Sequence, residues 1–227
     1  MREAFAKQLA ELESRLEDGL ERAAITLPEI AEAVQHPTPV RAQKLTDEAT
    51  RLRRAGRTVD SELVIVTARQ TPVASDLRLV LALIEVAHHS TLIANQFDLI
   101  GEQLTNIDAA PVDRDRTAAH VSAMAHLAGY QLAHAVSAFR TRDLAVAHRI
   151  DIEDDEIDKL NREVFGAALA LEDASEQHEL APRRVLIARS VERIADNAVD
   201  IAEQAAFVVT AERSEFTDAS LPRRRTL

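Results

Sequence analysis

The stretch LIARSVERIADNAVDIAEQ, residues 186–204, combines an apolar stripe with a row of acids. On a helix, residues spaced by four, four and three positions point to one side, so Glu192, Asp196, Asp200 and Glu203 share a narrow face. The opposite side is apolar and is expected to pack into a core. It is formed by Val191, Ile194, Ala195, Ala198, Ile201, Ala202 and Ala205. The segment therefore predicts an amphipathic helix with an acidic edge.

A related block lies upstream, in EVAHHSTLIANQFDLIGEQ, residues 85–103. The segments before the two blocks also correspond, KLTDEATRLRR (44–54) with IDIEDDEIDKLNR (150–162). Such internal similarity indicates a duplicated structural unit. The paired positions of the two blocks are Ala87 with Ala188, Ile93 with Ile194, Ala94 with Ala195, Ile100 with Ile201, and Glu102 with Glu203.

Prolines separate the helical patterns and predict an all-α fold of six long helices. Pro28 falls inside the first segment and should kink or split that helix, whereas Pro182 is expected to precede the last one. The helices are predicted at 2–35, 40–69, 74–104, 114–140, 143–172 and 183–212. The first carries an apolar stripe at Phe5, Leu9, Leu12, Leu16 and Leu20.

The duplication predicts two tandem three-helix bundles, one in residues 1–108 and one in residues 109–212. Helices of about 30 residues are about 45 Å long, which suits two slender bundles side by side. The remaining residues, 213–227, end in PRRRTL and are expected to form a disordered basic tail.

Composition excludes several classes of protein. The net charge of −11 argues against nucleic acid as a partner. The chain has no cysteine, so a metal would be held by oxygen or imidazole ligands. No run of 18 apolar residues is present to span a membrane. The N-terminal MREAFAKQLAELESRL lacks the apolar core of a secretion signal, which predicts a cytoplasmic protein.

The acidic edge has two interpretations. It can be an ordinary solvated face, or it can be one wall of a cation site. Asp154 and Asp158 form a second acidic pair on the preceding helix, which should lie antiparallel beside the last one. Facing acidic stripes repel unless cations lie between them, and clustered oxygens suit divalent cations. In the first copy the corresponding positions are all uncharged: Thr46, Thr50, Thr91, Asn95 and Leu99.

Three blocks resemble the PhoU family of phosphate-signalling regulators: QTPVASDLR (70–78), DDEID (154–158) and ARSVERIADNAVDIAE (188–203). They occur in the family's order, and the resemblance covers nearly the whole chain. Ala195 replaces the usual glycine and Asp200 the usual asparagine. The QTPVASDLR block also fits a helix cap and turn, with Ser75 or Asp76 capping the following helix.

The resemblance implies a surface cluster of iron, zinc, manganese or magnesium. Its candidate ligands are Asp154, Asp158, Glu192, Asp196 and Asp200, with Glu203 a weaker candidate. Because the first copy lacks the acids, one metal site per chain is expected.

The resemblance also implies a function. It predicts a non-enzymatic, cytoplasmic negative regulator that couples a phosphate ABC transporter to a sensor histidine kinase. Such a protein would act as a homodimer, without nucleic acid, and would reach the membrane only through its partners. Two alternatives stay open: a metal-dependent enzyme or storage protein that uses the acidic cluster, and a helical adaptor whose acids contact basic partner surfaces.

Other motifs are weaker. Glu85 and His88 form the E-x-x-H pair of di-iron bundles, but the chain has no second one. His88 and His89 are expected to be exposed or to pair between helices. His120, His126 and His134 have spacings that predict packing or surface roles. The sequence has no Gly-rich phosphate loop and no recognisable nucleophile setting.

Overall fold

The computed structural model describes residues 2–70, 72, 74–105, 116–170 and 176–213, and all of its secondary structure in these ranges is α-helical. This confirms the predicted all-α class. The predicted tail lies outside the described residues except for Arg213. The helices are α1 (Arg2–Thr26), α2 (Pro28–Gln35), α3 (Pro39–Arg69), α4 (Ser75–Thr105), α5 (Arg116–Thr141), α6 (Leu144–Leu169) and α7 (Glu176–Thr210).

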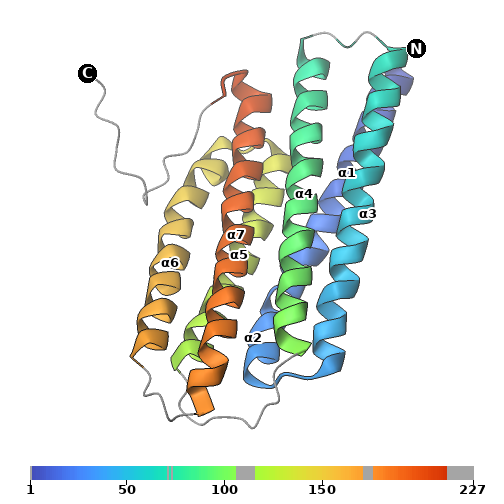
Figure 1. The fold of residues 1–227 in the computed structure, drawn as a ribbon. Helices are drawn as coiled ribbons and strands as arrows, with labels where there is room; N and C mark the ends of the chain where they lie inside the picture. The colour runs from blue at the N-terminus through green and yellow to red at the C-terminus, as the bar shows by residue number, and fades with distance from the viewer. Residues whose placement is uncertain (1, 71, 73, 106–115, 171–175, 214–227) are drawn as a thin grey trace.

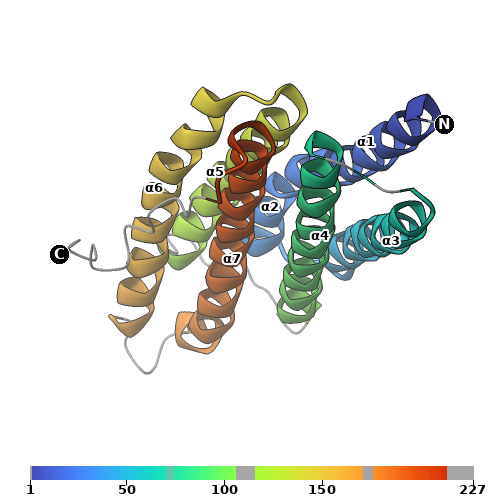
Figure 2. The ribbon, with the colours of Figure 1, turned by 90° about the horizontal axis from the view of Figure 1, so that it is seen from above.

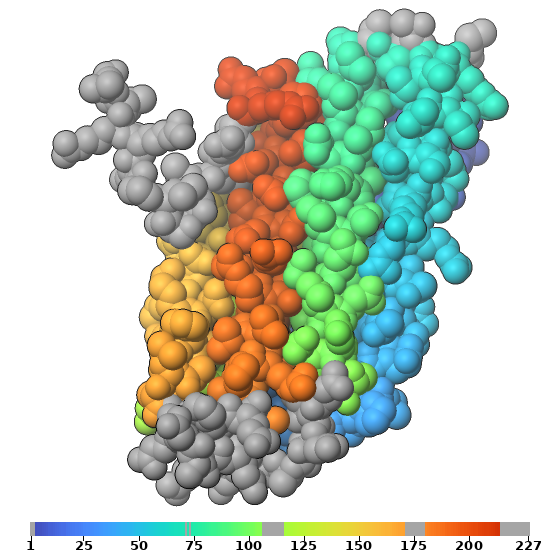
Figure 3. Space-filling model, viewed as in Figure 1, coloured from blue at the N-terminus to red at the C-terminus, as the bar shows by residue number. Residues whose placement is uncertain are grey.

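The helices form two layers. Helices α6, α7, α4 and α3 stand side by side in one layer, and α5, α2 and α1 lie behind them (Figures 1 and 2). Helices α3 and α4 pack closely, as do α6 and α7, and α4 against α7 joins the two pairs. The space-filling view shows these four helices as one continuous face (Figure 3).

Local sequence signals explain most helix boundaries. The first predicted helix ends at Thr26 and restarts at Pro28, which confirms the split. Proline is tolerated in a first turn because its missing N–H would be unpaired there. Helix α3 begins after Thr38, whose Oγ1 accepts a hydrogen bond from the Arg41 amide at 3.2 Å. Helix α6 begins after Asp143, whose carboxylate accepts from the Ala145 amide at 2.8 Å.

The last helix corrects one prediction. It begins at Glu176, so Pro182 lies inside α7 rather than before it. A proline in a helix removes one i→i−4 bond. Pro182 itself is exposed. A second correction concerns α4, where Ser75 and Asp76 lie within the first turn and neither makes a capping hydrogen bond to a residue that the structure describes. Ala74, with φ of 44°, precedes them.

The predicted apolar stripes form the core. Phe5, Leu9 and the three leucines that follow them on α1 are all buried, and so is the apolar side of α7. Small residues let the helices approach closely. A Cβ on Gly56 of α3 would lie 2.5 Å from Ser90 Oγ and 2.8 Å from the Ala87 carbonyl oxygen of α4. The break between α1 and α2 similarly lies against Gly129 of α5.

Helix α4 is long and apolar enough, by composition, to pass for a membrane span, and it is the one such helix in the described residues. Its buried side chains include Leu83, Val86, Phe97 and Ile100. These belong to the core between α3 and α7, and such burial is typical of a central helix of a bundle.

The close α3–α4 contact generates a stability prediction. Gly56→Ala should lower the free energy of unfolding by about 2 kcal/mol, because the new methyl group overlaps a backbone oxygen. Gly166→Ala is the matched control, since a Cβ there meets nothing within 4 Å. The control should raise the melting temperature by up to about 4 °C, through helix propensity. Thermal unfolding followed by circular dichroism measures both, and equal shifts would contradict the packing argument.

Candidate functional site

The structure brings four of the five predicted ligands together along the seam between α6 and α7. Asp154 and Asp158 come from α6, and Glu192 and Asp196 from α7. The negative charges of Asp158 and Asp154 both act on Glu192, and those of Glu192 and Asp158 act on Asp196. The two acidic stripes therefore face each other, as the antiparallel arrangement predicts.

Glu192 is the most buried member of this acidic cluster, with 7% of its surface exposed. Arg189, one turn earlier on α7, pairs with its Oε1. Its Oε2 is buried and has no hydrogen-bond partner among the residues that the structure describes. Burial raises the pKa of Glu192, Arg189 opposes this shift, and Asp158 and Asp154 add to it. A buried carboxylate oxygen without a partner is costly, so this atom marks the place where the cluster lacks a positive group or donor.

The two α6 acids have partners from their surroundings. Asp154 Oδ1 accepts a hydrogen bond from Gln131 Nε2 of α5 at 2.9 Å. Asp158 Oδ2 lies 3.4 Å from Arg162 Nη1, one turn along α6. With Arg189, Arg162 supplies positive charge from the same two helices that carry the acids. The predicted repulsion between the stripes is thus partly relieved by side chains of the chain itself.

Asp196 has the most strongly perturbed carboxyl group of the seam. Dehydration of the carboxyl between the helices, followed by the charges of Glu192 and Asp158, raises its pKa to about 7. The side chain nevertheless stays accessible to solvent. At neutral pH this carboxyl is therefore partly protonated.

Asp200 lies toward α4 rather than α6. Its Oδ2 is 3.4 Å from His89 Nδ1, which also lies 2.8 Å from Asn197 Oδ1. Burial raises the pKa of Asp200, His89 opposes the shift, and Glu85 adds to it. The fifth predicted ligand thus extends the acidic edge across the α4–α7 seam, and His89 confirms the predicted interhelical pairing. His88 is exposed beside it, with the ring centroids 5.7 Å apart.

The donor chemistry of the cluster fits a cation that prefers oxygen ligands, and the unpaired Glu192 oxygen points to one missing partner. As the side chains stand, however, no group of three or more His, Asp or Glu in the described ranges is arranged to hold a metal ion. Arg189 and Arg162 occupy the counter-charge positions instead.

The first copy differs at the corresponding face. Arg53 of α3 pairs with Asp98 of α4 and donates to Asn95 Oδ1 at 3.1 Å. Thr46 and Thr91 turn their hydroxyls to carbonyls of their own helices, Ala42 and Ala87. A cationic side chain therefore spans the α3–α4 seam, where the second copy has facing carboxylates.

Two histidines of α5 pair with glutamates of α6, and His126 of α5 is exposed. His134 Nδ1 lies 2.9 Å from Glu153, and His120 Nδ1 lies 3.4 Å from Glu163. These are surface pairs, in agreement with the predicted surface roles. Sequence reasoning missed the contributions of Arg162, Arg189 and Gln131 to the acidic cluster. Both arginines lie three or four positions from an acid, a spacing that could have identified them, whereas Gln131 approaches from another helix.

The comparisons with known proteins all find proteins named PhoU. The profile described as the PhoU domain matches residues 121–205. A phosphate-specific transport system accessory protein PhoU homolog from Rhizobium meliloti is 25% identical over 211 residues, covering 91% of this chain and 87% of that protein. The PhoU homolog 1 of Mycobacterium leprae is 29% identical over 223 residues, with 92% and 94% covered.

Two solved structures share the fold. The phosphate transport system regulatory protein PhoU from Streptococcus pneumoniae superimposes with a TM-score of 0.81, covering 92% of this chain and 99% of that one, at 18% identity. PhoU from Pseudomonas aeruginosa gives a TM-score of 0.70, with 93% and 100% covered, at 19% identity. At these identities the likeness concerns the fold.

The raised pKa of Asp196 generates a pH prediction. A carboxyl whose pKa rises from 3.8 to about 7 on folding favours the native state while protonated. Its stabilising contribution is present below pH 4 and is lost as the pH rises to 7. Asp196→Asn keeps the group neutral, so it should raise the melting temperature of the metal-free protein by about 2–4 °C at pH 8 and hardly change it at pH 4.

Thermal unfolding in the presence of a chelator at the two pH values measures this difference. Asp60→Asn, at an exposed position of α3, is the control and should show no such pH-dependent gain. A melting temperature of Asp196→Asn that matches the wild type at pH 8 would contradict the assignment.

Proposed function

We propose that this chain, which carries a PhoU-domain match at residues 121–205 and is similar to PhoU accessory proteins over nine-tenths of its length, is a negative regulator of phosphate-starvation signalling. In this proposal it couples the phosphate ABC transporter to a sensor histidine kinase and holds the kinase in its signal-off state when phosphate is plentiful. The observation that carries the proposal is the match with accessory proteins over nine-tenths of the chain.

The shape of the molecule supports a role in binding other proteins. Helices α3, α4, α7 and α6 present one long face, and long helices in a row offer grooves for helical partners (Figure 3). Beside the acidic cluster lies a shallow apolar groove of about 360 Å³. It is lined by Asn161, Arg162, Phe165, Val185, Leu186 and Arg189. An apolar groove bordered by two arginines suits contact with another protein.

Loss of the protein should raise the expression of phosphate-starvation genes in phosphate-rich medium. The expected direction follows from the proposed repression of the kinase. Transcript levels in a deletion strain and in a complemented strain measure this effect. Unchanged expression in a strain without a second copy of the gene would count against the regulatory role.

We also propose that the α6–α7 seam binds a metal cation, with Asp154, Asp158, Glu192 and Asp196 as ligands and Asp200 at its edge. A cation would supply the positive charge that Glu192 Oε2 lacks and would favour the ionised form of Asp196. Iron, zinc, manganese and magnesium all accept carboxylate oxygens.

Elemental analysis by mass spectrometry of the purified, untagged protein tests the metal proposal. Glu192→Ala with Asp196→Ala should abolish the bound metal, because both carboxylates leave the seam. The matched control is Thr91→Ala with Asn95→Ala, at the corresponding positions of the first copy, and should keep the wild-type metal content. Equal metal content in all three proteins would refute a site on this seam, and loss only in the control would place it in the first copy.

A further inference from the structure

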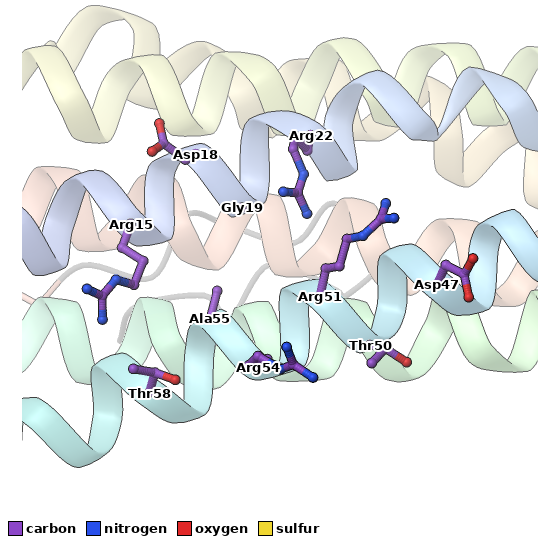
Figure 4. Close-up of a pocket in the computed structure, with 10 residues that line it drawn as sticks. All are labelled: Arg15, Asp18, Gly19, Arg22, Asp47, Thr50, Arg51, Arg54, Ala55 and Thr58. Atoms are coloured by element: carbon purple, nitrogen blue, oxygen red, sulfur yellow. The ribbon is translucent and has the colours of Figure 1, made fainter.

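A groove between α1 and α3 is rich in arginine although the chain as a whole carries a net charge of −11. Arg15 and Arg22 reach into it from α1, and Arg51 and Arg54 line it from α3 (Figure 4). Thr50 and Thr58 add hydroxyl groups to its α3 wall. The volume of the groove is about 740 Å³. The side chains that line this groove are mostly positively charged, whereas the acidic cluster between α6 and α7 is negatively charged.

A buried carboxylate holds two of these arginines in place. Glu48, with 4% of its surface exposed, lies 3.0 Å from Arg22 Nη2 and 3.4 Å from Arg51 Nη1. Each guanidinium uses one nitrogen in this contact, and a guanidinium has five N–H donors. Both arginines are therefore fixed in position while most of their donors stay available for an anion. Such preorganisation lowers the entropy lost on binding.

One arginine of the groove has no partner in the part of the chain that the structure describes. Arg54 makes no ion pair or hydrogen bond with the residues that the structure describes, and the same holds for the Arg57 guanidinium. Arg57 lines an adjoining hollow of about 670 Å³, which shares Thr50, Arg54 and Thr58 with the groove. The positive lining thus continues along α3 for two turns.

Acidic side chains only partly offset this charge. Arg15 pairs with Glu62 at 3.0 Å through one nitrogen. Asp47 lies at one end of the groove and accepts a hydrogen bond from Gln43. Asp18 points away from α3, whereas Arg15, Arg22 and Arg51 point toward the space between the helices (Figure 4).

We propose that this arginine groove binds a short chain of phosphate groups. Guanidinium groups bind phosphate oxygens in a bidentate manner, and the threonine hydroxyls can donate to further oxygens. Arg15 and Arg22 are seven residues apart, which on a helix is about 10 Å. That length exceeds one phosphate and suits two or three linked ones. The groove has no aromatic lining residue for a base to stack on, so recognition is of the phosphate chain itself.

The inference rests on the groove alone and is independent of the proposed regulatory role. Inorganic condensed phosphate and the triphosphate tail of a nucleotide share this chemistry. Isothermal titration calorimetry of the full chain, at low salt and with a chelator present, compares orthophosphate, pyrophosphate, tripolyphosphate and ATP. Tripolyphosphate should bind at least about tenfold more tightly than orthophosphate, because it contacts more of the arginines.

The comparison with ATP identifies the source of the phosphate chain. Equal affinity for ATP and tripolyphosphate would show that the groove accepts either source of the phosphate chain. Weaker binding of ATP would identify inorganic condensed phosphate as the preferred ligand. Both outcomes support the proposal. Absence of saturable binding for every probe overturns it, and so does equal binding of an acidic peptide, which would assign the groove to a protein segment.

Arginine-to-alanine variants test whether tripolyphosphate binds in the arginine groove. Arg54→Ala should weaken tripolyphosphate binding about tenfold, because it removes charge-assisted hydrogen bonds. Since Arg54 has no partner in the described residues, its loss should leave folding intact, which circular dichroism checks. The matched control is Arg149→Ala, an exposed arginine of α6 away from the groove, which should bind within twofold of the wild type. An equal loss in both variants would show non-specific charge attraction and would refute the site.

Discussion

The burial of α7 against three helices at once is the constraint on which the rest of the structure depends. This helix packs on α4, α5 and α6, so most of its surface must be apolar and small. The alanines at 188, 195, 198 and 202 have no exposed surface, and they allow the neighbouring helices to approach closely. Charged groups are left only the edges of the helix. Glu192 and Asp196 therefore lie at the α6 seam and Asp200 at the α4 seam.

A carboxylate at such an edge is partly buried, and leaving it without a partner costs free energy. Different side chains supply the partners at each of the two seams. At the α6 seam, Arg189 and Arg162 supply charge, Gln131 supplies a hydrogen bond, and one oxygen of Glu192 stays without a partner. At the α4 seam, His89 lies against both Asp200 and Asn197. The first seam therefore combines accumulated negative charge with an unsatisfied buried atom, which is the physical basis for the proposed cation.

The two halves of the chain that the sequence alignment pairs carry opposite charges at their corresponding seams. In the first copy, Arg53 spans the seam where the second copy has facing acids, and the α1–α3 groove adds further arginines. Buried Glu48 orders two of those arginines, much as Arg189 balances buried Glu192 in the second copy. A helical bundle tolerates such divergence because its stability depends on the buried apolar faces, and both copies have kept these.

The sequence by itself determined the all-α class, the break at Pro28, the buried stripe from Phe5 to Leu20 and the buried apolar side of α7. These follow from local geometry, because helical periodicity and proline chemistry act within a few residues. Tertiary structure decided the rest. Only packing between helices brings Gln131 to Asp154, His89 to Asp200, and Arg22 with Arg51 to Glu48. Helix α7 also continues through Pro182, where proline chemistry predicts a boundary. The pKa of Asp196 depends on burial and on charges from a second helix, which no spacing within one helix specifies.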